Sequence, residues 1–223
     1  MDSYNKILNN KFYLETVDKI EKKHFITNGK WDWDHGLGHY KRVAYYAENI
    51  LKQLNADSRT IELAKIAALL HDIGLSESNI NKTEHALLSA NIFRNYLDGI
   101  DVNKNEQEIL EQAIRDHSNG NDIKTLVGLS LVLADKLDVT YHRTINSSIQ
   151  DKLNTEIQKI KKVDINISSK DLALNYTTEN KFDLNILKDW RKAILIPYKI
   201  SSYLNISFIF SINNEIKDIS SFK

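Results

Sequence analysis

Histidine and aspartate side chains that could bind a metal ion are spread along the chain before residue 140. They are His39, His71, Asp72, His85, His117 and Asp135. The chain has no cysteine, so nitrogen and oxygen atoms must hold any metal. Imidazole together with carboxylate suits manganese, iron, cobalt, nickel or zinc better than magnesium or calcium alone. A cation of this kind lowers the pKa of a bound water from about 15.7 toward 7, which makes hydrolysis available.

These side chains lie at the ends of apolar stripes that have helical spacing. Val43, Ala47 and Ile50 form one stripe, and a step of four residues back from Val43 leads to His39. Stripes on four further segments end or begin at the others: His71, His85, His117, and Asp135 with Asp138. A single buried histidine is an ordinary core residue. Several buried without partners would each cost about 1–3 kcal/mol, so a shared cation is the simplest explanation.

Asp72 follows His71 directly, which constrains the helix that carries them. In a regular helix, neighbouring side chains point about 100° apart. Both can contact one ion only if the helix ends or distorts at this point. Gly74, two residues further on, is predicted to supply that break.

The residues that carry and surround these groups read as one helix after another. Apolar periodicity predicts helices over 3–27, 38–54, 58–71, 83–98, 105–117, 124–139 and 143–160. Asp34 is expected to cap the helix that carries His39, because aspartate accepts the unpaired N–H groups of a helix start. Trp31 and Trp33 are expected to pack at the rim of the site.

The hydrophobic period changes in the last third of the chain. Apolar residues alternate with polar ones over 163–168 and again over 172–176, which predicts two strands. A helix around 184–194 is expected to end or kink at Pro197, and a last strand is predicted over 204–212.

The predicted fold is therefore mostly α, with a small C-terminal unit. Residues 1–160 form the helical part and residues 161–223 form a small α+β unit of ββαβ order. The chain has 30 basic and 30 acidic residues, so it has no general attraction to nucleic acid or to an anionic membrane. The N-terminus lacks a signal-peptide pattern and no apolar run approaches membrane-spanning length, so a cytoplasmic protein is expected.

Five short motifs resemble, in order and spacing, the successive motifs of the HD superfamily of metal-dependent phosphohydrolases. They are GHYKRVAYYA, AALLHDIG, EHALLSANIF, AIRDHS and LADKLD. The resemblance spans about residues 31–143. It implies that residues 1–160 contain an all-helical HD-domain core.

The resemblance also implies a set of metal ligands. In this family, positions like His39, His71, Asp72 and Asp135 ligate one divalent cation. In branches with two metals, positions like His85 and His117 bind the second ion, and the aspartate of the His-Asp pair bridges the two. In single-metal branches the same two positions face the substrate phosphate. One or two transition-metal ions, from manganese, iron, cobalt, nickel or zinc, are therefore expected.

The function that follows is hydrolysis of a phosphoester or phosphoanhydride, with a nucleotide as the favoured substrate. His71, Asp72 and Lys136 are the predicted catalytic residues, and His35, Lys136 and Arg143 the predicted substrate contacts. The segment HDIGLSES lacks the Glu-Asp pair of the hydrolases of the stringent-response alarmone, which disfavours that activity.

Two other functions remain open at this stage. The same ligands suit a two-iron oxygenase, and a metal-stabilised helical domain could act as a signalling module without turnover. The expected partner is a small phosphorylated molecule. No membrane or clear nucleic-acid partner is indicated, while exposed strand edges in the C-terminal unit could pair two copies into a homodimer.

Overall fold

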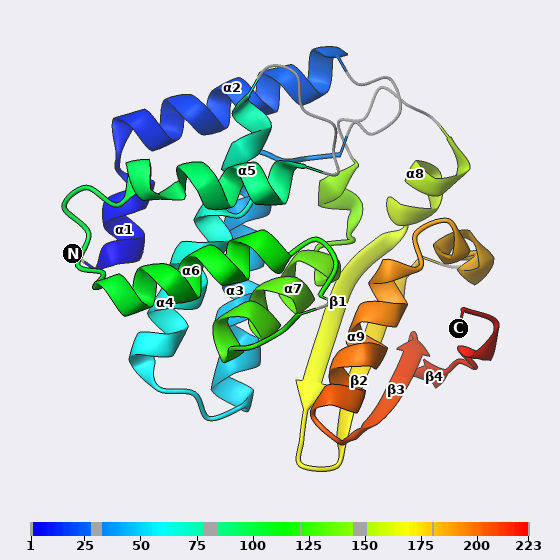
Figure 1. Cartoon of the computed structure of the whole chain (residues 1–223). Helices are drawn as coiled ribbons and strands as arrows, with labels where there is room; N and C mark the ends of the chain where they lie inside the picture. The colour runs from blue at the N-terminus through cyan, green and yellow to red at the C-terminus, as the bar shows by residue number, and fades with distance from the viewer. Residues whose placement is uncertain are drawn as a thin grey trace.

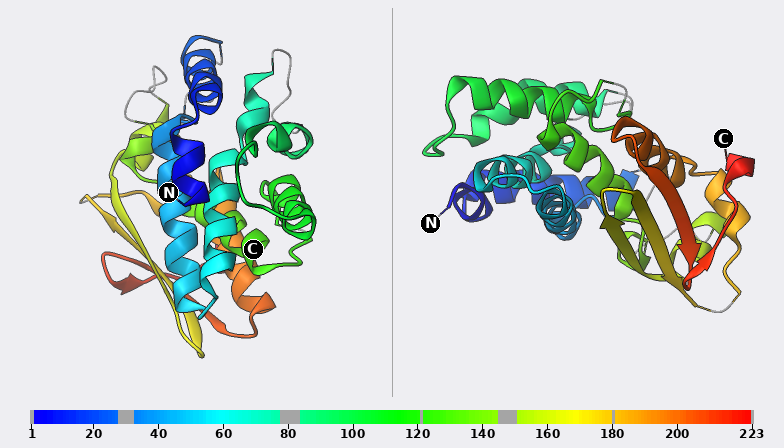
Figure 2. Two further views of the ribbon diagram at one scale, coloured as in Figure 1. Left: turned by 90° about the vertical axis from the view of Figure 1, so that its left-hand side faces the viewer. Right: turned by 90° about the horizontal axis from the view of Figure 1, so that it is seen from below.

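The computed structural model of the chain describes residues 2–27, 33–77, 84–120, 122–144, 151–179 and 181–222. Its helices run over Ser3–Leu8 (α1), Lys11–Thr27 (α2), Leu37–Gln53 (α3), Ser58–Leu70 (α4), His85–Ile92 (α5), Lys104–Asp116 (α6), Leu126–Leu137 (α7), Lys152–Ile157 (α8) and Lys192–Tyr203 (α9). Short 3₁₀ helices cover Ile73–Ser76 (η1), Phe93–Tyr96 (η2), Tyr141–Arg143 (η3), Leu184–Lys188 (η4) and Ser220–Phe222 (η5). Helices form one side of the molecule and a small sheet forms the other (Figures 1 and 2). The predicted fold class is confirmed.

Short polar side chains start most of these helices. Asp57 accepts a hydrogen bond from the backbone N–H of Thr60 at the start of α4, and Thr125 accepts one from Gly128 at the start of α7. Asn103 and Glu106 form a reciprocal capping box at the start of α6. Among the residues described, none of the helices combines the length and the hydropathy needed to cross a bilayer.

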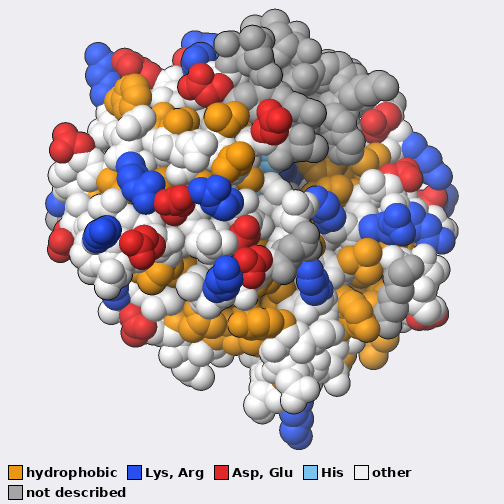
Figure 3. All heavy atoms as spheres, in the orientation of Figure 1, with side chains coloured by type: hydrophobic (Ala, Val, Ile, Leu, Met, Phe, Trp, Pro, Cys, Tyr) orange, Lys and Arg blue, Asp and Glu red, His pale blue; other side chains and the backbone are white. Residues whose placement is uncertain are grey.

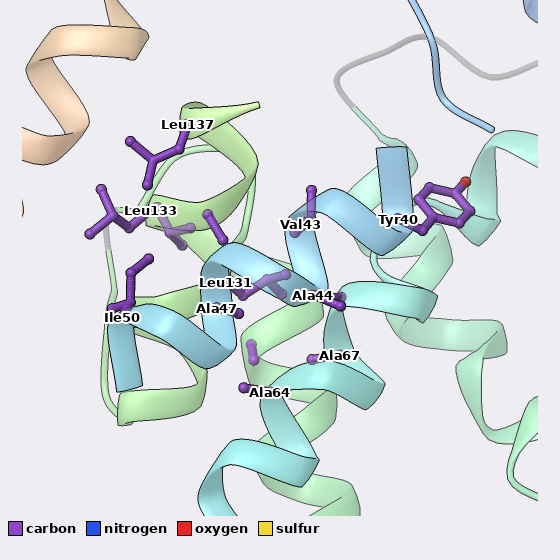
Figure 4. Close-up of a cluster of buried hydrophobic side chains, with 14 of the residues drawn as sticks. Tyr40, Val43, Ala44, Ala47, Ile50, Ala64, Ala67, Leu131, Leu133 and Leu137 are labelled. Carbon is purple, nitrogen blue, oxygen red and sulfur yellow. The ribbon is translucent and has the colours of Figure 1, made fainter. Parts of the chain in front are cut away.

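The core of the helical part lies where α3, α4 and α7 meet. Ala44 and Ala47 of α3, Ala64 and Ala67 of α4 and Leu131 of α7 are all at most 1% exposed (Figure 4). Alanine side chains are short, so they let neighbouring helices pack closely. This packing holds the start of α3 beside the end of α4.

The sheet has the strand order β1-β2-β3-β4. The strands are Ile160–Ile167 (β1), Asp171–Thr178 (β2), Ser207–Ile212 (β3) and Glu215–Ile216 (β4). β1 and β2 are antiparallel, β2 and β3 are parallel and joined through α9, and β3 and β4 are antiparallel. The predicted ββαβ order is confirmed. β4 is an additional strand that was not predicted, and it follows a two-residue turn with positive φ at Asn213 and Asn214.

The sheet and the helices share one buried cluster of apolar side chains. Leu174, Tyr176 and Phe210 of the sheet belong to the same cluster as the core of the helical part, and α9 packs against α7 as well as against the strands. The division into units at residue 160 stays a prediction.

Three of the helices predicted from the sequence have the wrong extent. The segment 3–27 is divided into α1 and α2, because the side chain of Asn10 accepts a hydrogen bond from the backbone N–H of Tyr13 and starts a new helix. The helix predicted over 143–160 reduces to α8, which Asp151 caps through the N–H of Asn154. Residues 145–150 lie outside the described part of the chain. Similarly, the helix predicted over 83–98 divides into α5 and η2.

The last helix does not end at Pro197, because α9 continues to Tyr203. A kink at Pro197 stays a prediction. A proline inside a helix removes the N–H that would bond the carbonyl four residues earlier, here that of Ala193. The hydroxyl of Tyr176 donates to this carbonyl at 3.4 Å, so the acceptor keeps a partner. Because α9 extends this far, β3 begins at Ser207 and not at 204.

Gly74 allows the chain after α4 to pass very close to α5. A Cβ at this position would lie 2.5 Å from the backbone nitrogen of Ser89 and 2.6 Å from the carbonyl oxygen of His85. The predicted helix end is confirmed, since α4 ends at Leu70 and Asp72 has φ −110° and ψ 6°. The reason for the glycine differs from the prediction: it permits close packing against α5 and does not form a left-handed helix cap.

We expect Gly74→Ala to lower the free energy of unfolding by about 1–3 kcal/mol, because the added methyl group must displace the backbone of α5. Urea denaturation followed by circular dichroism measures this. Gly128→Ala is the matched control. Its Cβ would make ordinary contacts of 3.5 to 3.9 Å with Thr125 and with Ala113 of α6, and alanine is a better helix former than glycine in α7. Equal stability of the two variants would contradict the packing argument.

Candidate metal centre

The six predicted ligands come together from five helices. His39 lies in the first turn of α3, His71 and His117 directly follow α4 and α6, and His85 begins α5. Asp72 follows the end of α4, and Asp135 lies in the last turn of α7. Helix ends therefore supply almost the whole site, and the end of α4 turns Asp72 toward the same point as His71.

One group of ligand atoms surrounds the Nε2 atoms of His39 and His71. These two nitrogens are 3.2 Å apart. Asp72 Oδ2 lies 3.8 Å from His39 Nε2 and 3.3 Å from His71 Nε2. Asp135 Oδ1 lies 3.6 and 3.9 Å from the same nitrogens. Ligand atoms of His39, His71 and Asp135 all lie within 4.8 Å of one another, and Asp72 adjoins them through the two nitrogens, as the site of one divalent ion requires.

A second group forms around the other oxygen of Asp72. Asp72 Oδ1 is 3.3 Å from His85 Nε2 and 3.3 Å from His117 Nε2, and the two nitrogens are 3.0 Å apart. This oxygen is buried and accepts no hydrogen bond of standard geometry from the part of the chain that the structure describes. A buried carboxylate oxygen without such a donor is costly, and a cation would satisfy it.

Hydrogen bonds at Nδ1 fix the orientation of three imidazoles. Nδ1 of His71 donates to the carbonyl of Ala68 at 2.8 Å, and Nδ1 of His117 donates to that of Ile114 at 2.7 Å. Nδ1 of His39 lies 2.7 Å from the Asp138 carboxylate, which can only accept when ionised. In the neutral rings the lone pairs are therefore on Nε2, and they point at one another. Two lone pairs 3.2 Å apart need a positive charge between them.

The pKa values of the buried groups agree with this requirement. Burial lowers the pKa of His39 well below its usual range and lowers that of His117 to about 4, so both rings are neutral at neutral pH. Burial also acts to lower the pKa of His71, but Asp72 and Asp135 outweigh it and raise that pKa. Burial acts to raise the pKa of Asp72, but the charge on His71 outweighs it and the pKa falls well below its usual value. In the metal-free protein, a proton on His71 thus supplies positive charge to the cluster.

A salt-bridge network supports His39 at Nδ1, on the side of the ring away from the ligand cluster. Asp138 is fully buried and also accepts from Nε of Arg42 at 2.7 Å. Arg42 donates in turn to Asp34 at 2.8 Å. Arg42 was not among the predicted site residues, although it lies one helical turn after His39 on α3. Asp34 does not cap α3 as predicted: Gly36 is the N-cap residue, and Asp34 accepts the N–H of Gly36 at 2.7 Å.

A cavity of about 350 Å³ opens above the cluster. The three predicted substrate contacts line it: His35, Lys136 and Arg143. Nδ1 of His35 lies 3.0 Å from Asp72 Oδ2, and Lys136 is paired with Asp135. A histidine side chain is visible inside this hollow in the space-filling view, with Lys or Arg side chains beside it (Figure 3).

The structure adds residues that the sequence did not single out for this site. Ser118 Oγ lies 3.1 Å from His85 Nε2, and only its place beside His117 could have suggested it. Trp190 and Lys192 line the cavity from the C-terminal unit, and Trp190 packs edge-on against Trp33. Trp33 is buried, as expected for rim packing, and Trp31 lies outside the described residues.

Asp138→Asn should weaken metal binding about 10- to 100-fold, because the amide no longer holds the Nδ1–H of His39 by charge. Titration of manganese into metal-free protein by calorimetry measures the affinity. Asp164→Asn, at a half-exposed carboxylate paired with Lys162, is the control and should bind like the wild type. Wild-type affinity in Asp138→Asn would show that this carboxylate does not support the site.

Metal binding should release a proton and become weaker as the pH falls. The raised pKa of His71 means that the free protein holds a proton where the ion must bind, and protons compete better at lower pH. Manganese titrations between about pH 6 and pH 8, in buffers of different ionisation enthalpy, measure both effects. An affinity that stays constant over this range would contradict the pKa direction given for His71.

Comparison with known proteins agrees with this geometry. Residues 36–140 match the family model of the HD domain. An uncharacterized protein of Clostridium beijerinckii is 33% identical over 122 residues, which make up 52% of this chain and 72% of that protein.

A solved structure of a predicted HD superfamily hydrolase from an uncultured Thermotogales bacterium is 27% identical. The match covers 56% of this chain and 67% of that one, with a TM-score of 0.43. The matched family segment holds every one of the six ligand positions at the cluster. Residues 36–140 are thus an HD domain, and the chain belongs to the HD superfamily.

Proposed function

We propose that this protein is a metal-dependent phosphohydrolase that acts on a small phosphoester or phosphoanhydride, with a nucleotide as the favoured substrate. One observation carries the proposal. Four Nε2 atoms converge on the two oxygens of Asp72, which lines a cavity that also presents Lys136 and Arg143. Side chains that can bind a metal cation and side chains that can bind a phosphate anion thus lie at the same cavity.

The donor set fits a divalent ion at His39, His71, Asp72 and Asp135, and the second oxygen of Asp72 offers a place for another beside His85 and His117. A bound ion of this type lowers the pKa of a water ligand and polarises a phosphoryl oxygen. His39, His117 and Asp72 are already in the protonation states that such an ion needs, and His71 would give up its proton when the ion binds.

The side chains around the cavity have separate tasks in this proposal. Lys136 is 8% exposed and pairs with Asp135, so its ammonium stands where a phosphoryl oxygen would approach the cluster. Arg143 is 4% exposed, and its guanidinium is held by the backbone carbonyl of Asp34. His35, beside Asp72, can hold a proton or donate one toward the substrate.

His71→Ala and Asp72→Ala should each lower phosphoester hydrolysis by on the order of 100-fold or more, since each removes a group that holds the ion. The assay is a panel of nucleotides and simple phosphoesters with manganese, with circular dichroism to verify folding. His142→Ala is the matched control, because His142 stacks on Tyr141 outside the cluster. Full activity in both cluster variants would overturn the proposal.

A two-iron oxygenase would use the same ligands, because the two oxygens of Asp72 face two pairs of histidines. Metal analysis together with an anaerobic assay separates the two functions. Phosphoester hydrolysis that continues without oxygen supports the hydrolase. Two irons per chain with an oxygen-dependent activity, and no hydrolysis, would support the oxygenase.

A further inference from the structure

The C-terminal unit reaches the cavity through the segment that begins α9. Trp190 and Lys192 line the cavity, and both lie outside the HD-domain segment 36–140. The Lys192 ammonium donates to the carbonyl of Ser118 and to the side chain of Asn119, each at 3.0 Å. Ser118 directly follows His117, so Lys192 stands next to one end of the ligand cluster.

The charge at this place favours an anion. The partners that the structure gives for the Lys192 ammonium are neutral oxygens. The side chains of Lys136 and Lys192 both line the cavity. Burial and the charge of Lys136 lower the pKa of Lys192, and together they outweigh the charge of Asp135, which acts to raise it. Lys192 also begins α9, whose first turn has no acidic residue, and the positive end of the helix dipole adds to its charge. A bound anion would be attracted by both ammonium groups and by the start of α9.

The apolar wall beside these cations is aromatic. The rings of Trp33 and Trp190 meet edge to face with centroids 4.7 Å apart. Trp33 is anchored by a hydrogen bond from its ring N–H to the side chain of Asn154 at 2.6 Å. A fixed pair of indoles next to a cationic end suits a substrate that has a flat apolar group attached to a phosphoryl group.

We propose that the C-terminal unit completes the substrate pocket, with Lys192 binding the phosphoryl group together with Lys136 and Trp190 contacting a flat leaving group. The proposal rests on the proposed function and deepens it. It makes these two residues determinants of specificity that the HD domain alone does not provide. The cavity volume of about 350 Å³ is near the lower end for small-molecule sites, roughly 300–1,000 Å³. The proposed substrate is therefore small.

Two phosphonates that cannot be hydrolysed test this inference without turnover. Methylphosphonate carries the anionic group alone, and phenylphosphonate adds a flat ring. Calorimetry with full-length, manganese-loaded protein measures both affinities. Wild type should bind phenylphosphonate more tightly than methylphosphonate, because the ring contacts the tryptophan wall.

Lys192→Gln should weaken both phosphonates about 10- to 100-fold, because a charged hydrogen bond is lost, and Lys192→Arg should restore most of the affinity. Trp190→Leu, which keeps apolar bulk, should remove the preference for the phenyl compound and leave methylphosphonate binding nearly unchanged. Lys199→Gln is the control, since Lys199 lies on the same helix but is not among the residues that line the cavity. Manganese content, measured on each variant, should stay equal, which a purely structural role of Lys192 at Ser118 would not predict.

Three results would overturn the inference: no phosphonate binding by the wild type, affinity within twofold of wild type in Lys192→Gln, or an unchanged phenyl preference in Trp190→Leu. Its failure is distinct from failure of the proposed function. If the wild type hydrolyses no phosphoester but binds phosphonates through Lys192, the pocket inference stands and the proposed function fails. If the wild type hydrolyses phosphoesters but Lys192→Gln binds phosphonates as tightly as the wild type, the proposed function stands and the pocket inference fails.

Discussion

The structure depends on the electrostatics of Asp72 between two pairs of imidazoles. Each oxygen of this carboxylate faces two Nε2 atoms within 3.8 Å. Hydrogen bonds at Nδ1 direct the Nε2 atoms of His39, His71 and His117 inward. Buried without a positive charge, such an arrangement is repulsive and poorly solvated. A cation makes every one of these contacts favourable, so the fold and its metal should stabilise each other.

The helices pack so that these ligand side chains lie close enough to share a cation. The ligands sit at helix ends, where the chain can change direction, and close packing at alanines and at Gly74 brings those ends together. Hydrogen bonds that they donate to backbone carbonyls orient His71 and His117, while Asp138 and Arg42 orient His39. Ligand geometry is thereby set by the fold before any ion binds, which lowers the conformational cost of binding.

Much of the site could be predicted from the sequence because helical periodicity is a local property. The stripe that leads to His39 or to His117 is readable from spacing alone, and so is the need for a helix end between His71 and Asp72. The points at which a predicted helix is interrupted could not be predicted, because an interruption can depend on a single side chain, as at Asn10. The continuation of α9 through Pro197 depends on the hydroxyl of Tyr176, which comes from a different strand. Trp190 and Lys192 carry no motif, and only the packing of α9 against α7 brings them to the cavity.

The central claim is that one cation centre forms at this cluster. Crystals of the protein soaked in manganese, with diffraction recorded at a wavelength where manganese scatters anomalously, test it directly. The account predicts an anomalous peak within about 2.0–2.3 Å of His71 Nε2 and of an Asp72 oxygen. A protein that takes up manganese elsewhere, or a map with no peak among these side chains, would contradict it.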